Sequence, residues 1–198
     1  MPPIAQMCRS VWWAFAVAGA FAVAAAALVA AAVVTPGRGA AAWQALAGVL
    51  LLIAAFRAPG GLARTLPFLG AAGTGVVLGG AGLALPTLDP RIALIGIGIW
   101  GAVAAAGYLA IARIARALHV PDGGLYSVGW LGLAIGIAVS TLPAFGLGAS
   151  TFVPAGALAA TGAVSIMAAV RLRVLPDEAP PAFSHREARR RERSDRRP

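Results

Sequence analysis

Six long apolar runs constrain this chain more than any other feature of its sequence. None of them contains Asp, Glu, Lys, Arg or His, and they cover residues 11–34, 40–56, 66–85, 92–112, 127–142 and 151–170. The hydrocarbon core of a bilayer is crossed by about 20 apolar residues, and a helix lets such a segment satisfy its own backbone hydrogen bonds. The sequence therefore predicts an all-α fold, a polytopic membrane bundle of six transmembrane helices.

Composition divides the chain into two parts. It is 60% hydrophobic and only 12% charged, which is typical of a membrane domain and is predicted here for residues 1–175. Residues 176–198 are rich in Pro and Arg and are predicted to form a disordered cytoplasmic tail. The net charge of +9 could indicate a nucleic-acid partner. In the tail, however, Glu187, Glu192 and Asp195 alternate with the arginines, and no aromatic residues lie among the arginines to stack on bases. We expect the tail to bind anionic lipid and expect no nucleic-acid partner.

The first apolar run has two readings, because Arg9 precedes it and Ala-x-Ala sites lie within it. A cleaved secretory signal has an apolar region of about 7 to 15 residues. The run over 11–34 is longer than that, so the sequence favours an uncleaved membrane anchor. Cleavage would leave five helices.

The arginines predict how the helices are oriented. One side of the membrane receives Arg9, Arg57, Arg64, Arg113, Arg116, Arg171, Arg173 and the tail, whereas the other receives only Arg38 and Arg91. Basic residues accumulate on the cytoplasmic side, so both termini are predicted to be cytoplasmic. All sixteen basic residues are Arg, and with abundant Ala and Gly this bias suggests a GC-rich bacterial genome and hence a bacterial inner membrane. Arg57, Arg113 and Arg171 are predicted to anchor the helix ends to anionic inner-leaflet lipids. Interfacial positions are expected for Trp12, Trp13, Trp43, Tyr126 and Trp130, and an interior packing position for Trp100.

A weak internal repeat runs through the apolar segments. Gly75-Val-Val-Leu-Gly79 before Pro86 matches Gly132-Leu-Ala-Ile-Gly136 before Pro143 at an offset of 57 residues. Three further positions lie nine residues before an arginine, namely Gly48 before Arg57, Ala104 before Arg113 and Gly162 before Arg171. The pattern predicts three repeated helical hairpins, each with an outbound helix ending near a proline and an inbound helix ending at an arginine.

Two glycine pairs are the candidate helix-packing residues. A phosphate-binding loop would need G-x-G-x-x-G or a Walker motif, but the glycines around Gly75 have neither spacing and the chain contains no lysine. Gly75 and Gly79 instead lie four residues apart on one helical face, as do Gly132 and Gly136, which permits close backbone contact. The third and fifth helices are therefore expected to make tight contacts, either with each other or across a homo-oligomer.

The spans lack the groups that intramembrane catalysis usually uses. All seven acidic residues lie in loops or in the tail, and His119 and His185 are too isolated for a metal site. Ser140 and Thr141 have no neighbouring base in any span and are expected to bond back to the preceding turn. Gln44, Thr74, Tyr108, Thr161 and Ser165 are expected to join helices. The sequence predicts no catalytic residue, no metal, no cofactor and no enzymatic activity, and it identifies no ligand.

The segments "WQALAGVLLLIAAFRAP" and "GWLGLAIGIAVSTLP" give the chain a resemblance to the HdeD-type acid-resistance membrane proteins of bacteria. The resemblance covers most of residues 11–173 and implies six helices and a role in acid or envelope stress. The leading hypothesis is a non-enzymatic inner-membrane protein with a stress-associated or structural role. The alternative is a small transporter or a permease subunit, and association with itself or with another membrane protein stays open.

Overall fold

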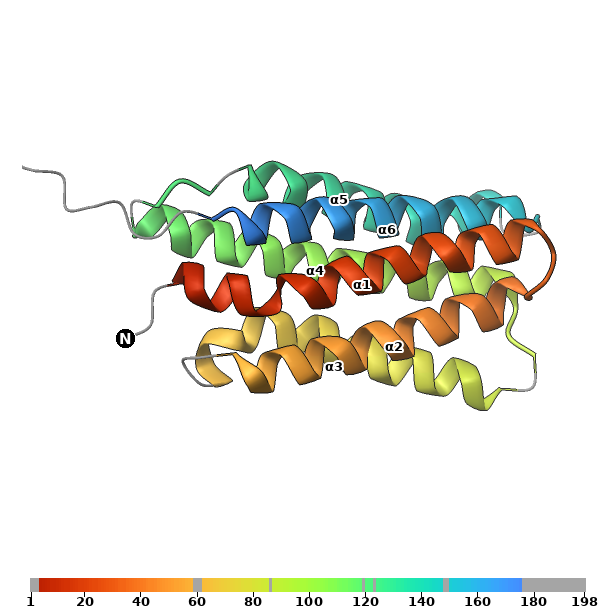
Figure 1. Ribbon diagram of the computed structural model, residues 1–198. Coiled ribbons are helices and arrows are strands. Elements are labelled where there is room, and N and C mark those ends of the chain that lie inside the picture. The colour runs from red at the N-terminus through yellow and green to blue at the C-terminus, as the bar shows by residue number, and fades with distance from the viewer. Residues whose placement is uncertain are drawn as a thin grey trace, which may run out of the picture.

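The computed structural model describes residues 4–58, 62–85, 87–118, 120–122, 124–147 and 150–175. These residues form six α-helices and one 3-10 turn, with no strand among them (Figure 1). The elements are α1 (Ile4–Ala30), α2 (Pro36–Arg57), α3 (Leu62–Ala84), α4 (Pro90–Ala117), α5 (Leu125–Thr141), η1 (Leu142–Phe145) and α6 (Phe152–Arg173). Pro86, His119, His185 and the tail over 176–198 lie outside the described residues.

All six helices are long and apolar enough to cross a membrane, which indicates a multi-pass integral membrane protein. The helices extend beyond most of the predicted spans at their charged ends, because Arg57, Arg113, Arg116, Arg171 and Arg173 continue the helical turns. α1 differs most from its prediction: it begins at Ile4 rather than near residue 11 and ends at Ala30 rather than near residue 34.

A local turn explains why α1 ends early. Ala32 has a φ of 56°, the left-handed conformation that closes many helices. The amide of Val33 donates to the carbonyl of Leu28, and the amide of Ala32 donates to that of Val29. These two bonds satisfy terminal carbonyls and redirect the chain toward α2, which begins at Pro36, where a proline loses no helical hydrogen bond.

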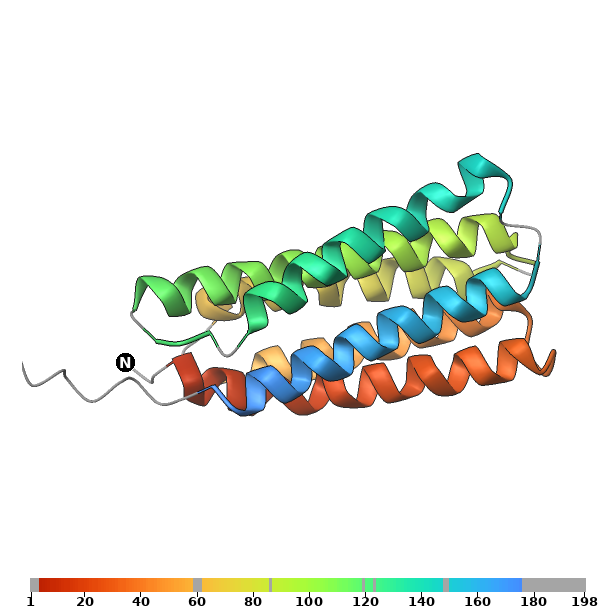
Figure 2. The ribbon, with the colours of Figure 1, turned by 90° about the horizontal axis from the view of Figure 1, so that it is seen from above.

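The three most extensive helix contacts are α1 with α6, α2 with α3, and α4 with α5. Weaker contacts join α1 to α2, α3 to α4, and α5 to α6, so the six helices form a closed ring (Figures 1 and 2). The even-numbered helices also contact one another, and more than half of each is buried, against less than half of each odd-numbered helix. The bundle therefore has an inner set of three helices, each covered by one outer helix.

Aromatic side chains from α1, α2, α3 and α4 pack against one another in the core. Trp43 and Trp100 pack edge to face with centroids 4.7 Å apart, and Phe15 contacts Tyr108 at 5.1 Å and Phe68 at 5.4 Å. All five are at most 1% exposed. The prediction of an interfacial position for Trp43 is wrong, because α2 begins four residues earlier than the predicted span and the Trp43 Nε1–H finds a buried acceptor, the Ala18 carbonyl, at 3.0 Å.

Candidate functional site

Gly75 and Gly79 lie on the face of α3 that meets α2. A Cβ added to Gly75 would lie 2.8 Å from the Gln44 carbonyl oxygen and 2.9 Å from the Gly48 Cα, and a Cβ added to Gly79 would overlap the backbone nitrogen of Ala45. Ordinary van der Waals contact starts at 3.4 Å. The two helix backbones therefore touch where both carry no side chain or a small one, which is how helices associate closely in lipid.

Gly136 lies on the corresponding face of α5 against α4, and Gly132 lies where α5 meets both α4 and α6. A Cβ on Gly136 would lie 2.5 Å from the Ala102 nitrogen and 2.8 Å from the Gly98 carbonyl oxygen. A Cβ on Gly132 would be less crowded, 3.0 Å from Val164 and 3.1 Å from Ala105. Gly75, Gly79 and Gly136 thus face the helix that precedes their own in the chain, Gly132 lies between α4 and α6, and these glycines of α3 and α5 do not pack against each other.

A third close approach joins the two ends of the chain, and the sequence did not single it out. A Cβ on Gly19 of α1 would lie 2.7 Å from the Gly162 carbonyl oxygen, and a Cβ on Gly162 of α6 would lie 2.8 Å from the Gly19 carbonyl oxygen. Gly19 has no second glycine four residues away, so the small-residue pattern passes over it. The sequence did contain one indication of this contact in Gly162. That glycine precedes Arg171 by the same nine residues that separate Gly48 from Arg57.

The predicted anchor arginines lie at one end of the bundle, the end where α2, α4 and α6 terminate (Figure 1). Arg57, Arg113 and Arg171 are all exposed. Two other arginines at this end make cation–π contacts. The Arg116 guanidinium lies 3.9 Å from the ring centre of Tyr126 and forms a salt bridge of 2.7 Å with Asp122. The Arg173 guanidinium lies 4.9 Å from the ring centre of Trp12. The stacked pairs tie α4 to α5 and α6 to α1.

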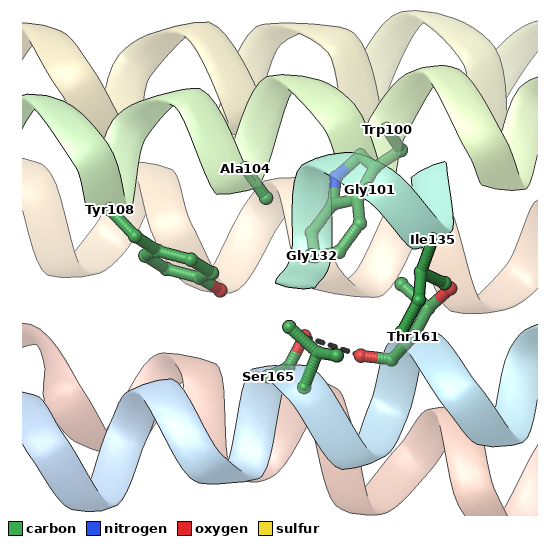
Figure 3. Close-up of a pocket in the computed structure, with 9 residues that line it drawn as sticks. Trp100, Gly101, Ala104, Tyr108, Gly132, Ile135, Thr161 and Ser165 are labelled. Carbon is green, nitrogen blue, oxygen red and sulfur yellow. Dashed lines mark hydrogen bonds between the residues drawn. The ribbon is translucent and has the colours of Figure 1, made fainter. Parts of the chain in front are cut away.

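A small cavity with a few polar groups in a mostly apolar wall lies between α4, α5 and α6 (Figure 3). Its lining residues come from the middle turns of these helices. Its walls include Trp100, Tyr108, Gly132, Thr161 and Ser165, and its volume of about 10 Å³ approaches the room that one water molecule needs. The Thr161 hydroxyl donates to the Ala157 carbonyl at 2.9 Å and the Ser165 hydroxyl to the Thr161 carbonyl at 3.0 Å. Because each hydroxyl donates within its own helix, its oxygen lone pairs stay available to the cavity.

The cavity and its neighbourhood hold polar atoms without a partner. Trp100 Nε1 is buried and makes no hydrogen bond with any described residue, and the same is true of Gln44 Nε2 on α2. The Tyr108 hydroxyl is also buried, and its polar neighbour is the Ser165 hydroxyl, with which it makes no hydrogen bond of ordinary length and angle. Leaving a buried donor unsatisfied costs about 1–3 kcal/mol. Figure 3 places the Tyr108 hydroxyl over the gap toward the α6 hydroxyls. This arrangement suits at most one water molecule between Tyr108 and α6.

Three other hydroxyl groups of the spans have partners within their own helix. Ser140 donates to the Ile137 carbonyl and Thr141 to the Ala138 carbonyl, both at 2.8 Å, and Thr74 donates to the Gly70 carbonyl at 2.8 Å. The residues that the structure describes contain no group of three or more His, Cys, Asp or Glu side chains able to hold a metal. The chain matches no protein-family model, and searches of curated proteins and of solved structures found no similar protein.

Proposed function

We propose that this chain is a non-enzymatic protein of the bacterial inner membrane, with a structural role that serves acid or envelope stress. The observation that carries the proposal is backbone contact in all three of the most extensive helix pairs, at Gly79 with Ala45, Gly136 with Ala102, and Gly162 with Gly19. Contacts of this kind resist helix sliding, because a bundle packed at backbone distance has little room to repack. A fixed bundle fits a scaffold better than a carrier that alternates between states.

The arginine distribution supports an orientation with both termini in the cytoplasm. The end of the bundle that holds Arg57, Arg113 and Arg171 also holds the beginning of α1 and the end of α6. Exposed guanidinium groups at this end are suited to the phosphates of anionic inner-leaflet lipids. The stress role comes from the resemblance to HdeD-type proteins.

Triplication of a helical hairpin is part of the same proposal. The contact of Gly79 with Ala45 and Ala41 recurs 57 residues later as the contact of Gly136 with Ala102 and Gly98. The most extensive contacts join each inner helix to an outer one, as in α2–α3, α4–α5 and α6–α1. The repeated hairpins of this proposal are α1–α2, α3–α4 and α5–α6, so these extensive contacts join each hairpin to the next, and the α6–α1 contact joins the third hairpin to the first.

Two experiments test this function. A scaffold should be purified from its native membrane, in mild detergent, alone or as a homo-oligomer, and recovery of a stoichiometric second protein would instead indicate a permease subunit. A strain from which the gene is deleted should survive a low-pH challenge less well than its parent and should recover when the gene is restored. Equal survival would contradict the stress role.

The small cavity between α4, α5 and α6 is the observation that favours the alternative, a small transporter. Tyr108, Thr161 and Ser165 line it in the middle of the apolar bundle, and polar groups in that position often mark a solute pathway. A transporter would give saturable solute flux in reconstituted vesicles, and Tyr108→Phe would reduce that flux. A scaffold would give vesicles no leakier than protein-free ones, with or without the substitution.

A further inference from the structure

A second cavity, here called the groove, lies toward the end of the bundle opposite Arg57, Arg113 and Arg171. It is formed by α1, α2 and the last turns of α3. Its volume is about 240 Å³, and every residue of its lining except Arg38 is apolar. The walls include Phe21, Ala24, Leu28, Ala42 and Leu83, and Arg38 lies at the same groove. Apolar cavities of this size hold apolar matter rather than water. The groove therefore has room for a short segment of hydrocarbon chain.

Arg38 makes the groove different from the rest of the apolar surface. Its side chain is exposed, and it forms no ion pair with any carboxylate among the described residues. It lies in the first turn of α2, which contains no acidic residue, and the N-cap residue Thr35 makes no side-chain hydrogen bond to that turn. The positive end of the helix dipole thus adds to the charge of the guanidinium. An anion beside Arg38 would be stabilised by both.

We propose that the groove between α1, α2 and α3 binds one anionic phospholipid, with an acyl chain along Phe21, Ala24 and Leu83 and the headgroup phosphate on Arg38. The two parts of the site match the two parts of the molecule. The apolar part of the groove binds the acyl chain. The Arg38 guanidinium, at the start of α2, binds the phosphate with the bidentate geometry that a guanidinium offers. A lipid held here would bridge α1, α2 and α3 where the weaker α1–α2 contact meets the α2–α3 pair.

The test is a lipid titration of the full-length protein in detergent micelles, followed by native mass spectrometry. Phosphatidylglycerol and phosphatidylcholine with identical acyl chains are the probes. One basic residue near a membrane surface is worth about 1 kcal/mol, so the first bound lipid should favour phosphatidylglycerol about fivefold. Arg38→Gln should abolish this preference. Arg91→Gln, which removes a cation at the same end of the bundle but outside the groove, should retain it.

A second pair of variants tests the chain-binding part of the site. Ala24→Phe fills the groove from α1, whereas Ala27→Phe adds the same ring to the same helix outside the groove. Both alanines are exposed, so neither ring enters the packed core. Ala24→Phe should weaken binding of both lipids several-fold, and Ala27→Phe should leave it unchanged.

Three results would overturn the proposal. They are equal binding of the two lipids by the unmodified protein, a preference lost equally in Arg38→Gln and Arg91→Gln, and equal effects of Ala24→Phe and Ala27→Phe. Thermal unfolding of each variant accompanies the titration, and a variant that melts like the parent but loses the lipid supports the site.

Discussion

Gly79 and Gly80 are adjacent glycines of α3 with opposite surroundings, and together they measure the close approach of α2. A Cβ at Gly79 would overlap the Ala45 nitrogen and lie 2.6 Å from the Ala45 Cα and 2.8 Å from the Ala41 carbonyl oxygen, whereas a Cβ at Gly80 would meet nothing within 4 Å. Replacing either glycine by alanine adds one methyl group and gains the same helix propensity, about 0.5–1 kcal/mol. The difference between the two variants therefore isolates the packing of α3 on α2.

The magnitude follows from the neighbouring atoms. All three lie in the α2 backbone, so no flexible side chain can move aside, and ordinary van der Waals contact starts at 3.4 Å. To bring the new methyl group to that distance from the Ala45 backbone, α2 and α3 must separate by about 1 Å, and overpacking of this kind costs about 1–3 kcal/mol. We expect the free energy of unfolding of Gly79→Ala to lie about 1–3 kcal/mol below that of Gly80→Ala. Gly80→Ala should be at least as stable as the parent.

The assay is reversible unfolding of the purified full chain in mixed micelles, with helicity followed by circular dichroism and the free energy extrapolated linearly. Both variants must retain the helicity of the parent before denaturant is added. If Gly79→Ala were as stable as Gly80→Ala, the two helices would not touch at backbone distance, and the main support for a rigid scaffold would be lost.

Three further predictions concern a turn, a hydrogen bond and the orientation. Ala32→Gly should raise the free energy of unfolding by about 1 kcal/mol, because Ala32 has a φ of 56° that glycine adopts without strain; a destabilised variant would contradict this. Trp43→Phe should cost about 0.5–1.5 kcal/mol more than Trp100→Phe, because Trp43 Nε1 donates to the Ala18 carbonyl and Trp100 Nε1 has no described partner. Reporters fused to either terminus should be cytoplasmic, and a tag inserted after Val34 should be labelled from outside; a terminus labelled from outside would refute the orientation.

The sequence predicted the class of fold because six long runs without charged residues are stable in the hydrocarbon of a bilayer and there must be helical. It also predicted which faces of α3 and α5 carry the tight contacts, since glycines four residues apart lie on one side of a helix. It could not predict the partner of each face. Gly75 and Gly132 look the same whether the facing helix is a neighbour in the chain or in another copy, and the choice depends on the summed packing of six helices.

The roles of several site residues could not be predicted for one physical reason. Each role depends on contacts between helices that are far apart in the sequence. Trp100 and Tyr108 lie eight residues apart on α4 and become one site only when Thr161 and Ser165 of α6 face them. Trp43 was expected at the interface by its place near a span end, but a buried carbonyl of α1 offered its N–H a partner. Arg38 was counted only as an exception to the charge asymmetry, because the groove beside it requires α1 and α3 to pack around α2.

The contact between α6 and α1 provides a way to test whether α1 remains in the mature protein or is cleaved. A Cβ on Gly162 would lie 2.8 Å from the Gly19 carbonyl oxygen and 2.9 Å from the Ala22 Cβ, whereas a Cβ on Gly156, in the same helix, would meet nothing within 4 Å. If α1 stays in the mature protein, Gly162→Ala should be about 1–3 kcal/mol less stable than Gly156→Ala.

If α1 were removed as a signal peptide, that face of α6 would be open to lipid, and both substitutions would gain the same small amount of helix propensity. Equal stability of the two variants, purified from the membrane with a carboxyl-terminal tag, would therefore refute the uncleaved anchor. A deficit confined to Gly162→Ala would place α1 within the native bundle, where Phe15, Ala18 and Ala22 belong to the buried core.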